Sequence, residues 1–147
     1  SPWYRQDEGT VVFEGIQTSS SISRGIYVFS DGTTNNRAFT NILPSGATAE
    51  SWLISAGSAE WTSASLTMPA LGSVFRHGYG YKLNNLAAVV NAGTVATDST
   101  AAMATITQLR FGAITFTGAN PFIGYARRFS YYNTRLPNTI LQGLSRV

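Results

Sequence analysis

The sequence predicts an all-β protein in which two antiparallel sheets pack as a sandwich, with one short helix near the C-terminus. Apolar and polar residues alternate with period two wherever patterning is visible, as expected of strands that bury one face. Turn residues (Gly, Asn, Asp, Pro) interrupt this alternation about every eight to twelve residues. Only residues 138–144 have helical spacing. Many short strands with such turns favour a two-sheet sandwich closed by Greek-key or jelly-roll crossings.

Local signals place the strands along the chain. Residues 24–30 (RGIYVFS) alternate and then reach the turn residues Asp31 and Gly32. Residues 86–90 are followed by Asn91-Ala92-Gly93, and Asn and Gly tolerate the positive φ that short hairpin loops require. The predicted strands are residues 9–16, 24–30, 37–43, 51–55, 59–66, 72–83, 86–90, 94–97, 107–115 and 124–132.

The last predicted strand has an irregular apolar spacing. Ala126, Phe129 and Tyr131 lie three and then two residues apart. A bulge near Arg127 and Arg128 would keep all three facing the core while both guanidinium groups point outward.

A short amphipathic helix is expected over residues 138–144. Pro137 precedes it, and proline is well tolerated near a helix start. Ile140, Leu141 and Leu144 fall on one face, which we expect to cover an open end of the sandwich. This terminal stretch therefore serves stability rather than chemistry.

Composition narrows the possible functions. The chain has 147 residues, the size of one domain, with 44% hydrophobic and only 12% charged residues. The net charge is +3, yet the basic residues are scattered singly except for Arg127 and Arg128, so no nucleic-acid partner is expected. No apolar run approaches the roughly 20 residues that span a bilayer, so no membrane insertion is expected.

Four stretches, taken in order, resemble a known family. They resemble the concanavalin A-like, laminin-G-like jelly rolls at the C-terminal ends of bacteriophage virion proteins, although the likeness is faint between residues 44 and 72. The stretches are VFSDGTTNNR (28–37), YKLNNLAAVVNAGTVATDST (81–100), LRFGA (109–113) and GYARRFSYYNTRLPNTILQGL (124–144).

The resemblance implies a biological setting. It implies one lectin-like jelly-roll domain over residues 1–147, which forms a C-terminal part of a longer virion protein; the first residue, Ser1 rather than Met, agrees with a processed product or fragment. Such a module would sit on the phage particle surface, in a tail-fibre-like or head-surface protein. Its expected partners are host surface glycan, other virion proteins and further copies of itself, such as a trimer.

Catalysis is not expected. Hydrolases of this fold commonly carry Glu-x-Asp-x-x-Glu or a close variant on one strand, and none of the seven acidic residues has that spacing. Asp7 and Glu8 are adjacent and would point to opposite faces of a strand. His77, the one histidine, is interpreted as an exposed or half-buried strand residue rather than a general base. A polysaccharide-degrading role is the least favoured alternative.

Glycan binding is the favoured function. Proteins hold sugars with aromatic rings on the apolar pyranose faces and with amide or guanidinium groups on the hydroxyls. For each aromatic residue the competing interpretation is a place in the core. The candidate ligand-binding residues are Trp52, Trp61, Asn35, Asn36, Arg37, Tyr79 and Tyr81.

Calcium is a possible cofactor, and none other is expected. Asp31, Asn35 and Asn36 offer oxygen ligands within six residues, as a hard cation prefers. The alternative, which we favour, is a turn in which these side chains bond to their own backbone.

A second function class stays open beside glycan binding. The module could be purely structural, decorating a capsid surface or capping a fibre or tail through protein contacts. Abundant Ala, Ser and Thr and many arginines would suit such a surface.

Overall fold

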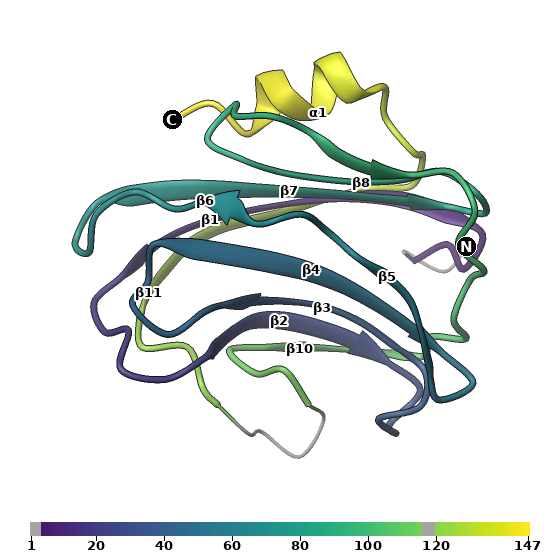
Figure 1. Cartoon of the computed structure of the whole chain (residues 1–147). Coiled ribbons are helices and arrows are strands. Elements are labelled where there is room, and N and C mark those ends of the chain that lie inside the picture. The colour runs from purple at the N-terminus through teal and green to yellow at the C-terminus, as the bar shows by residue number, and fades with distance from the viewer. Residues whose placement is uncertain (1–3, 116–119) are drawn as a thin grey trace.

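The protein is a sandwich of two antiparallel sheets, as a computed structural model describing residues 4–115 and 120–147 shows (Figure 1). In the described residues, sheet A has the strand order β11-β1-β7-β8-β9, and sheet B has the order β10-β2-β3-β4-β5, with β6 paired to β4. The predicted all-β sandwich with one short C-terminal helix is confirmed. Across the same residues, no helix is long and apolar enough to span a bilayer.

The strand bounds follow the sequence pattern closely. Residues 59–66 form two strands, and residues 107–115 form a strand only as far as Phe111, because Gly112 adopts a positive φ of 71°. The strand predicted over 51–55 begins three residues earlier, at Thr48, and the one predicted over 94–97 begins two residues later, at Ala96. The elements are β1 (Glu8–Gln17), β2 (Arg24–Ser30), β3 (Arg37–Ile42), β4 (Thr48–Ser55), β5 (Ser58–Thr62), β6 (Leu66–Thr67), β7 (Val74–Lys82), β8 (Leu86–Val90), β9 (Ala96–Asp98), β10 (Gln108–Phe111), β11 (Gly124–Tyr132) and α1 (Asn138–Leu144).

An aromatic core fills the space between the sheets. Phe13 and Phe75 from sheet A meet Tyr27 and Phe29 from sheet B, and all four are almost completely buried. Phe13 packs with its ring centroid 5.8 Å from Phe75 and 6.4 Å from Tyr27. Full burial of such a side chain is worth roughly 1.5–3 kcal/mol, so the core supplies most of the driving force for folding.

A polar bridge crosses this core at His77. The ring Nδ1 lies 2.9 Å from the Tyr27 hydroxyl and Nε2 lies 2.9 Å from Ser51 Oγ, which is itself 3.0 Å from Thr40 Oγ1. His77 belongs to sheet A and its three partners to sheet B. Burial lowers the pKa of His77 to about 3, so the ring is neutral, with one nitrogen donating and the other accepting.

The prediction of an exposed or half-buried His77 is therefore wrong, although the residue does lie in a strand. Its side chain has the same parity as the core residues Phe75 and Tyr79, and the facing hydroxyls satisfy both ring nitrogens. A fully buried imidazole with both nitrogens occupied cannot reach a substrate.

Helix α1 lies on the outer face of sheet A, above β7 and β8 (Figure 1). Leu141 is fully buried against Ala87 and Val89, and a Cβ at Gly78 would come within 2.7 Å of Leu141 Cδ1, so glycine permits this close approach. The predicted bounds are confirmed, but the predicted place at an open end of the sandwich is wrong. Ile140, expected on the packed face, is 49% exposed.

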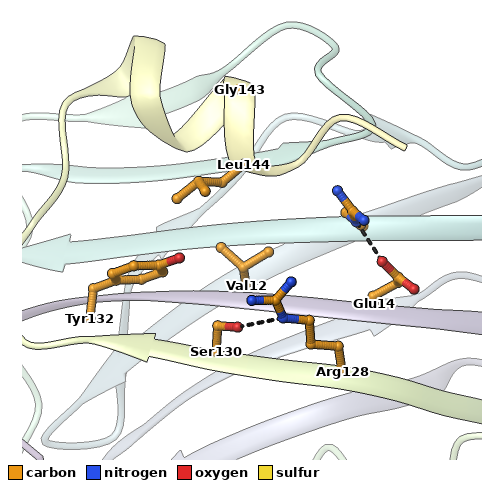
Figure 2. A pocket seen from close by; sticks show the side chains of 8 residues that line it. Val12, Glu14, Arg128, Ser130, Tyr132, Gly143 and Leu144 are labelled. Carbon is orange, nitrogen blue, oxygen red and sulfur yellow. Dashed lines mark hydrogen bonds and ion pairs between the residues drawn. The ribbon is translucent and has the colours of Figure 1, made fainter.

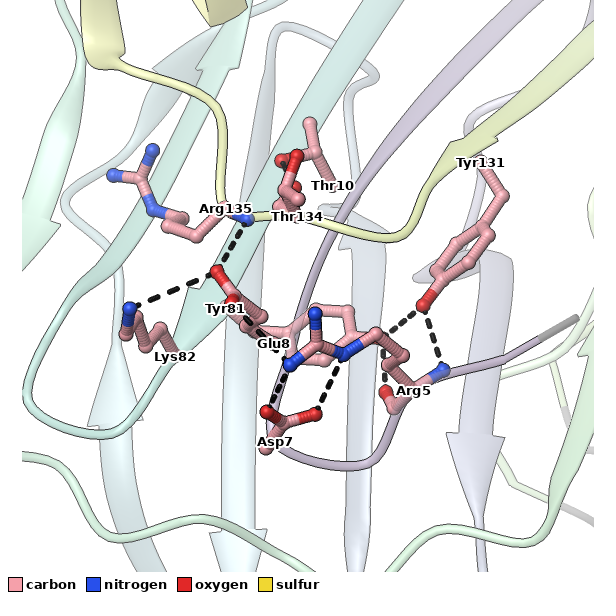
Figure 3. A network of polar contacts seen from close by, with 9 residues as sticks. All are labelled: Arg5, Asp7, Glu8, Thr10, Tyr81, Lys82, Tyr131, Thr134 and Arg135. Carbon is pink, nitrogen blue, oxygen red and sulfur yellow. Dashed lines mark hydrogen bonds and ion pairs between the residues drawn. The ribbon is translucent and has the colours of Figure 1, made fainter. Parts of the chain in front are cut away.

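The chain that leads into α1 is tied to β1. Thr10 Oγ1 donates to the carbonyl oxygen of Thr134 at 2.8 Å (Figure 3). It also accepts from the Leu136 amide at 2.9 Å. Glu8 Oε2 accepts from the Arg135 amide at 3.0 Å. Thr10 is fully buried, so these bonds are shielded from water.

The other end of α1 is tied to the turn after β8. Ser145 Oγ accepts from the Ala92 amide at 3.0 Å, and Gln142 Nε2 donates to the carbonyl oxygen of Gly93 at 2.7 Å. Both ends of the helix are thus fixed to sheet A.

The predicted bulge near Arg127 and Arg128 is confirmed. Glu14 pairs with Arg128 and Gly15 with Ala126, so Arg127 is the extra residue of β11. Ala126 pairs with Gly15, on the same side of the sheet as Phe13, but it is exposed rather than buried in the core. Phe129 is partly buried and packs against the core as expected.

Protonation of His77 should destabilise the fold. The folded pKa of about 3 lies below the ordinary 6.5, so the unfolded chain binds the proton more readily. The free energy of unfolding is therefore unaffected by protonation of His77 above pH 6.5. As the pH falls from 6.5 towards 3, it decreases by up to about 1.4 kcal/mol per pH unit. In NMR spectra of the folded protein the single histidine should show no titration between neutral pH and its folded pKa. A midpoint near 6.5 would contradict its burial.

Removing the Leu141 side chain should loosen α1. Leu141→Ala deletes a fully buried side chain and should lower the free energy of unfolding in urea by about 2–5 kcal/mol. Ile140→Ala, at the neighbouring exposed position, is the matched control and should stay within about 0.5 kcal/mol of wild type. Equal effects of the two substitutions would contradict the observed packing of the helix.

Candidate functional site

An aromatic and polar surface lies on the outer face of sheet B. Its side chains alternate with core residues along two neighbouring strands, so they point away from sheet A. We call this surface the Trp52 face. It consists of Arg37, Phe39 and Asn41 on β3 and Glu50 and Trp52 on β4.

Three of these side chains stack on one another. Phe39 and Trp52 face each other across the strands, with ring centroids 5.9 Å apart and planes 9° from parallel. The Arg37 guanidinium carbon lies 4.6 Å from the centre of the Phe39 ring, a cation–π arrangement. Trp52 Nε1 donates to Glu50 Oε2 at 3.3 Å. The result is a run of planar groups with polar atoms at its edges.

Two buried polar atoms on this face, Arg37 Nε and Asn41 Oδ1, have no hydrogen-bond partner among the described residues. Arg37 Nη1 does donate, to the carbonyl oxygen of Ile114 at 2.9 Å, and burial lowers the pKa of Arg37. Buried polar groups in native proteins are nearly always paired, and ordered water or a ligand often completes those that lack a protein partner. This is one mark of a binding surface.

The loop between β2 and β3 contains three further candidate ligand residues, Asp31, Asn35 and Asn36. Asp31 Oδ1 accepts from the amide and the hydroxyl of Thr33 at 2.8 and 2.7 Å, and its Oδ2 accepts from Asn36 Nδ2 at 2.8 Å. These bonds lower the pKa of Asp31. Asn36 Oδ1 accepts from the Ala56 amide at 3.0 Å, and Asn35 is exposed.

The Asp31 carboxylate is thus used within its own turn, as the alternative to a calcium site requires. In residues 4–115 and 120–147, no group of three or more His, Cys, Asp or Glu side chains could hold a metal ion. Asp31, Asn35 and Asn36 stay together on one loop, but only the first and last contact each other through their side chains.

The other aromatic candidates lie in the core. Trp61, Tyr79 and Tyr81 are 7%, 1% and 3% exposed, and Trp61 lies with its ring centroid 6.1 Å from that of Tyr79. Burial raises the pKa of both tyrosines. Tyr81 donates its hydroxyl to the carbonyl oxygen of Arg5 at 2.8 Å (Figure 3). These rings have no free face on which a sugar could stack, which leaves Trp52 and Arg37 as the predicted residues that meet on one surface.

A second surface, absent from the sequence-based candidates, is a pocket of about 150 Å³ on the outer face of sheet A (Figure 2). We call it the Arg128 pocket. Leu144 reaches into it from α1, opposite Val12 of the sheet. It is lined by Val12, Glu14, Arg76, Arg128, Ser130, Tyr132, Gly143 and Leu144. The residues come from four elements far apart in sequence, and the only local signal was the Arg127-Arg128 pair.

In the Arg128 pocket, Glu14 has two arginine partners, whereas Arg128 has no carboxylate partner among the described residues. Glu14 accepts from Arg76 Nε at 2.6 Å through Oε2 and lies 3.3 Å from Arg127 Nε through Oε1. Arg128 Nε donates to Ser130 Oγ at 3.1 Å, and within the described residues Arg128 forms no ion pair. Two guanidinium groups therefore pair with the one carboxylate, and the third, that of Arg128, pairs with no carboxylate of the described residues.

The chain has a concanavalin A-like jelly-roll fold, which comparisons with solved structures show. The carbohydrate-binding module CBM40 of a Ruminococcus gnavus sialidase, bound to α2,3-sialyllactose, matches with a TM-score of 0.80 and 18% identity over 97% of this chain and 84% of that one. A SAP-like pentraxin from Limulus polyphemus matches with a TM-score of 0.66 and 14% identity, over 94% and 68% of the two chains.

The same fold also occurs as one part of larger enzymes. A leech intramolecular trans-sialidase, in complex with 2,7-anhydro-Neu5Ac, matches with a TM-score of 0.79 and 17% identity, over 97% of this chain but 24% of that one. No protein-family model matches the sequence, and no curated protein sequence matches it. At these identities the likeness concerns the fold.

Calcium should not be needed for stability. Both carboxylate oxygens of Asp31 already accept hydrogen bonds within the 31–36 turn, so the turn holds its shape without a cation. The melting temperature should be the same in EDTA and in excess calcium chloride. A rise of several degrees with calcium that Asp31→Asn abolishes would show that the turn is a metal site after all.

Proposed function

We propose that this chain is a non-catalytic, lectin-like module that binds glycan through the Trp52 face. The observation that carries the proposal is the stack of Arg37, Phe39 and Trp52 on the side of sheet B that points away from the core. The fold shared with a carbohydrate-binding module agrees with it.

The chemistry of this face suits a sugar. An aromatic ring gives apolar contact to the C–H face of a pyranose at small entropic cost, because it has few rotatable bonds. Amide, carboxylate and guanidinium groups beside the ring can then orient the hydroxyls. Glu50 and Arg37 supply a carboxylate and a guanidinium within the same surface, while the amide of Asn41 is largely buried.

An acidic glycan is the ligand that we propose. Similar structures include a CBM40 module bound to α2,3- and to α2,6-sialyllactose, and sialic acid carries a carboxylate. Arg110 of β10 pairs with Val28, which pairs with Phe39, so Arg110 lies on the same face of sheet B as Arg37. Two guanidinium groups on the face of the sheet that carries the aromatic stack favour a negatively charged sugar.

The setting that we propose is the surface of a bacteriophage particle, where the module attaches the particle to host glycan. The support is the sequence resemblance of residues 28–37, 81–100, 109–113 and 124–144 to virion jelly rolls. A purely structural virion protein is the alternative, and a glycan-binding assay separates the two.

Trp52→Ala should weaken binding of sialyllactose at least about tenfold, or about 1.4 kcal/mol, without unfolding the protein. The substitution removes the outer ring of the stack while the core stays intact. Tyr125→Ala, which removes an aromatic side chain 66% exposed on β11, is the matched control and should bind as wild type does. Calorimetric titration measures both, and melting curves check folding.

Arg37→Gln separates recognition of the acid from recognition of the sugar. It should lower the affinity for sialyllactose but leave that for lactose unchanged, because only the former carries a carboxylate. If the wild-type protein binds no glycan while it co-purifies with intact particles, the adhesive function is wrong and the structural alternative replaces it.

A further inference from the structure

We propose that the Arg128 pocket is a second binding site, which takes a single carboxylate-bearing sugar unit. It lies on sheet A and the Trp52 face on sheet B, so the two sites share no residue and the second does not depend on the first.

The bulge places two consecutive arginines on one side of the sheet. In a regular strand, neighbouring residues point to opposite faces. Because Arg127 is the extra residue of β11, both Arg127 and Arg128 reach the side of Glu14: Arg127 Nε lies 3.3 Å from Glu14 Oε1, and Arg128 lines the pocket with Glu14. A bulge is a known means of aiming a side chain at a functional site.

Both oxygens of the Glu14 carboxylate are paired with arginines, whereas Arg128 has no carboxylate partner among the described residues. Glu14 is paired with Arg76 and Arg127, one to each oxygen. Arg128 keeps one hydrogen bond, from Nε to Ser130 Oγ, and in the described part of the chain no carboxylate pairs with it. A planar guanidinium in this state matches the geometry of an incoming carboxylate. Arg76 and Arg127 balance the charge of Glu14, so the preference for a sugar acid over phosphate comes from the rest of the lining, which phosphate is too small to contact.

The remaining lining suits a sugar ring. Val12 and Leu144 provide apolar contact, Tyr132 provides a ring with a hydroxyl, and Ser130 provides a second hydroxyl. The volume of about 150 Å³ is below the roughly 300–1,000 Å³ of pockets for drug-sized ligands, so it fits one sugar unit.

The pocket is formed before any ligand arrives. Its floor is β1, which is paired on both sides, by β11 and by β7. Its wall is the end of α1, fixed by buried Leu141 and by Arg76 Nη1, which donates to the carbonyl oxygen of Arg146 at 2.6 Å. A preformed site avoids the entropic cost of ordering a loop on binding.

NMR titration of the isotope-labelled chain with glucuronic acid, glucose and inorganic phosphate tests the proposal. Glucuronic acid should shift the amide signals of Val12, Ser130 and Tyr132, while glucose and phosphate should bind at least tenfold more weakly at this pocket. Arg128→Gln should weaken glucuronic acid binding at these signals at least tenfold. Arg128→Lys keeps the positive charge but not the two parallel N–H donors of the guanidinium, so its affinity for glucuronic acid should lie between those of Arg128→Gln and wild type.

Two control variants separate this site from its surroundings and from the Trp52 face. Lys82→Gln removes a positive charge of sheet A that pairs with Glu8 and does not line the pocket, so it should change the affinity less than threefold. Trp52→Ala should leave the shifts of Val12, Ser130 and Tyr132 intact, even if it abolishes binding on sheet B. The proposal is overturned if these signals do not move, if phosphate binds as tightly as glucuronic acid, or if folded Arg128→Gln binds as wild type does.

Discussion

The packing of two sheets across one apolar layer decides what each strand can present to solvent. Sheets in sandwiches lie about 10 Å apart, so every inward side chain meets the opposite sheet and none is left for a ligand. On β3, Ala38 and Ile42 are committed inward, and the residues between them must face out. A ligand site can therefore be built only on an outer face or at a loop, and both surfaces described above obey this constraint.

The polar bridge at His77 is the exception inside that layer. An apolar layer alone allows the two sheets to slide relative to each other, because hydrophobic packing is not directional. The Tyr27 hydroxyl and Ser51 Oγ hold the two ring nitrogens at 2.9 Å each, and shifting one sheet would leave buried polar groups unpaired. The bridge thus fixes how the two sheets are aligned. It also makes the fold sensitive to acid, because protonation of the buried His77 is unfavourable.

Local signals were enough to predict most elements. The Asn91-Ala92-Gly93 turn bounds β8, Pro137 precedes α1, and the irregular spacing of Phe129 and Tyr131 indicated the bulge. The candidate site residues were harder to predict. The alternation of residues shows which side chains share one face of a strand, but not which of the two faces points into the core.

The glycines of β7 contain information that the sequence analysis did not use. Gly78 and Gly80 alternate with Tyr79 and Tyr81, and a Cβ on either glycine would meet Leu141 or Arg135 within 2.8 Å. Glycines at every second position indicate that another segment covers that face of the strand closely. The tyrosines between them therefore point to the other face, into the core. The Arg128 pocket had no such signal, since it depends on the order β11-β1-β7, which is set by pairing between strands distant in sequence.

The placement of the two surfaces limits how the molecule can use them. The Trp52 face belongs to sheet B and the Arg128 pocket to sheet A beside α1, with the whole core between them (Figure 1). One short glycan cannot occupy both at once, so the two sites cannot raise each other's affinity for the same small ligand. They can act together only on a long or branched glycan or on two separate chains, where the gain depends on the span between sites rather than on new contacts. With the two proposed sites on opposite faces, the sandwich would therefore favour attachment to a dense glycan layer over capture of a free sugar.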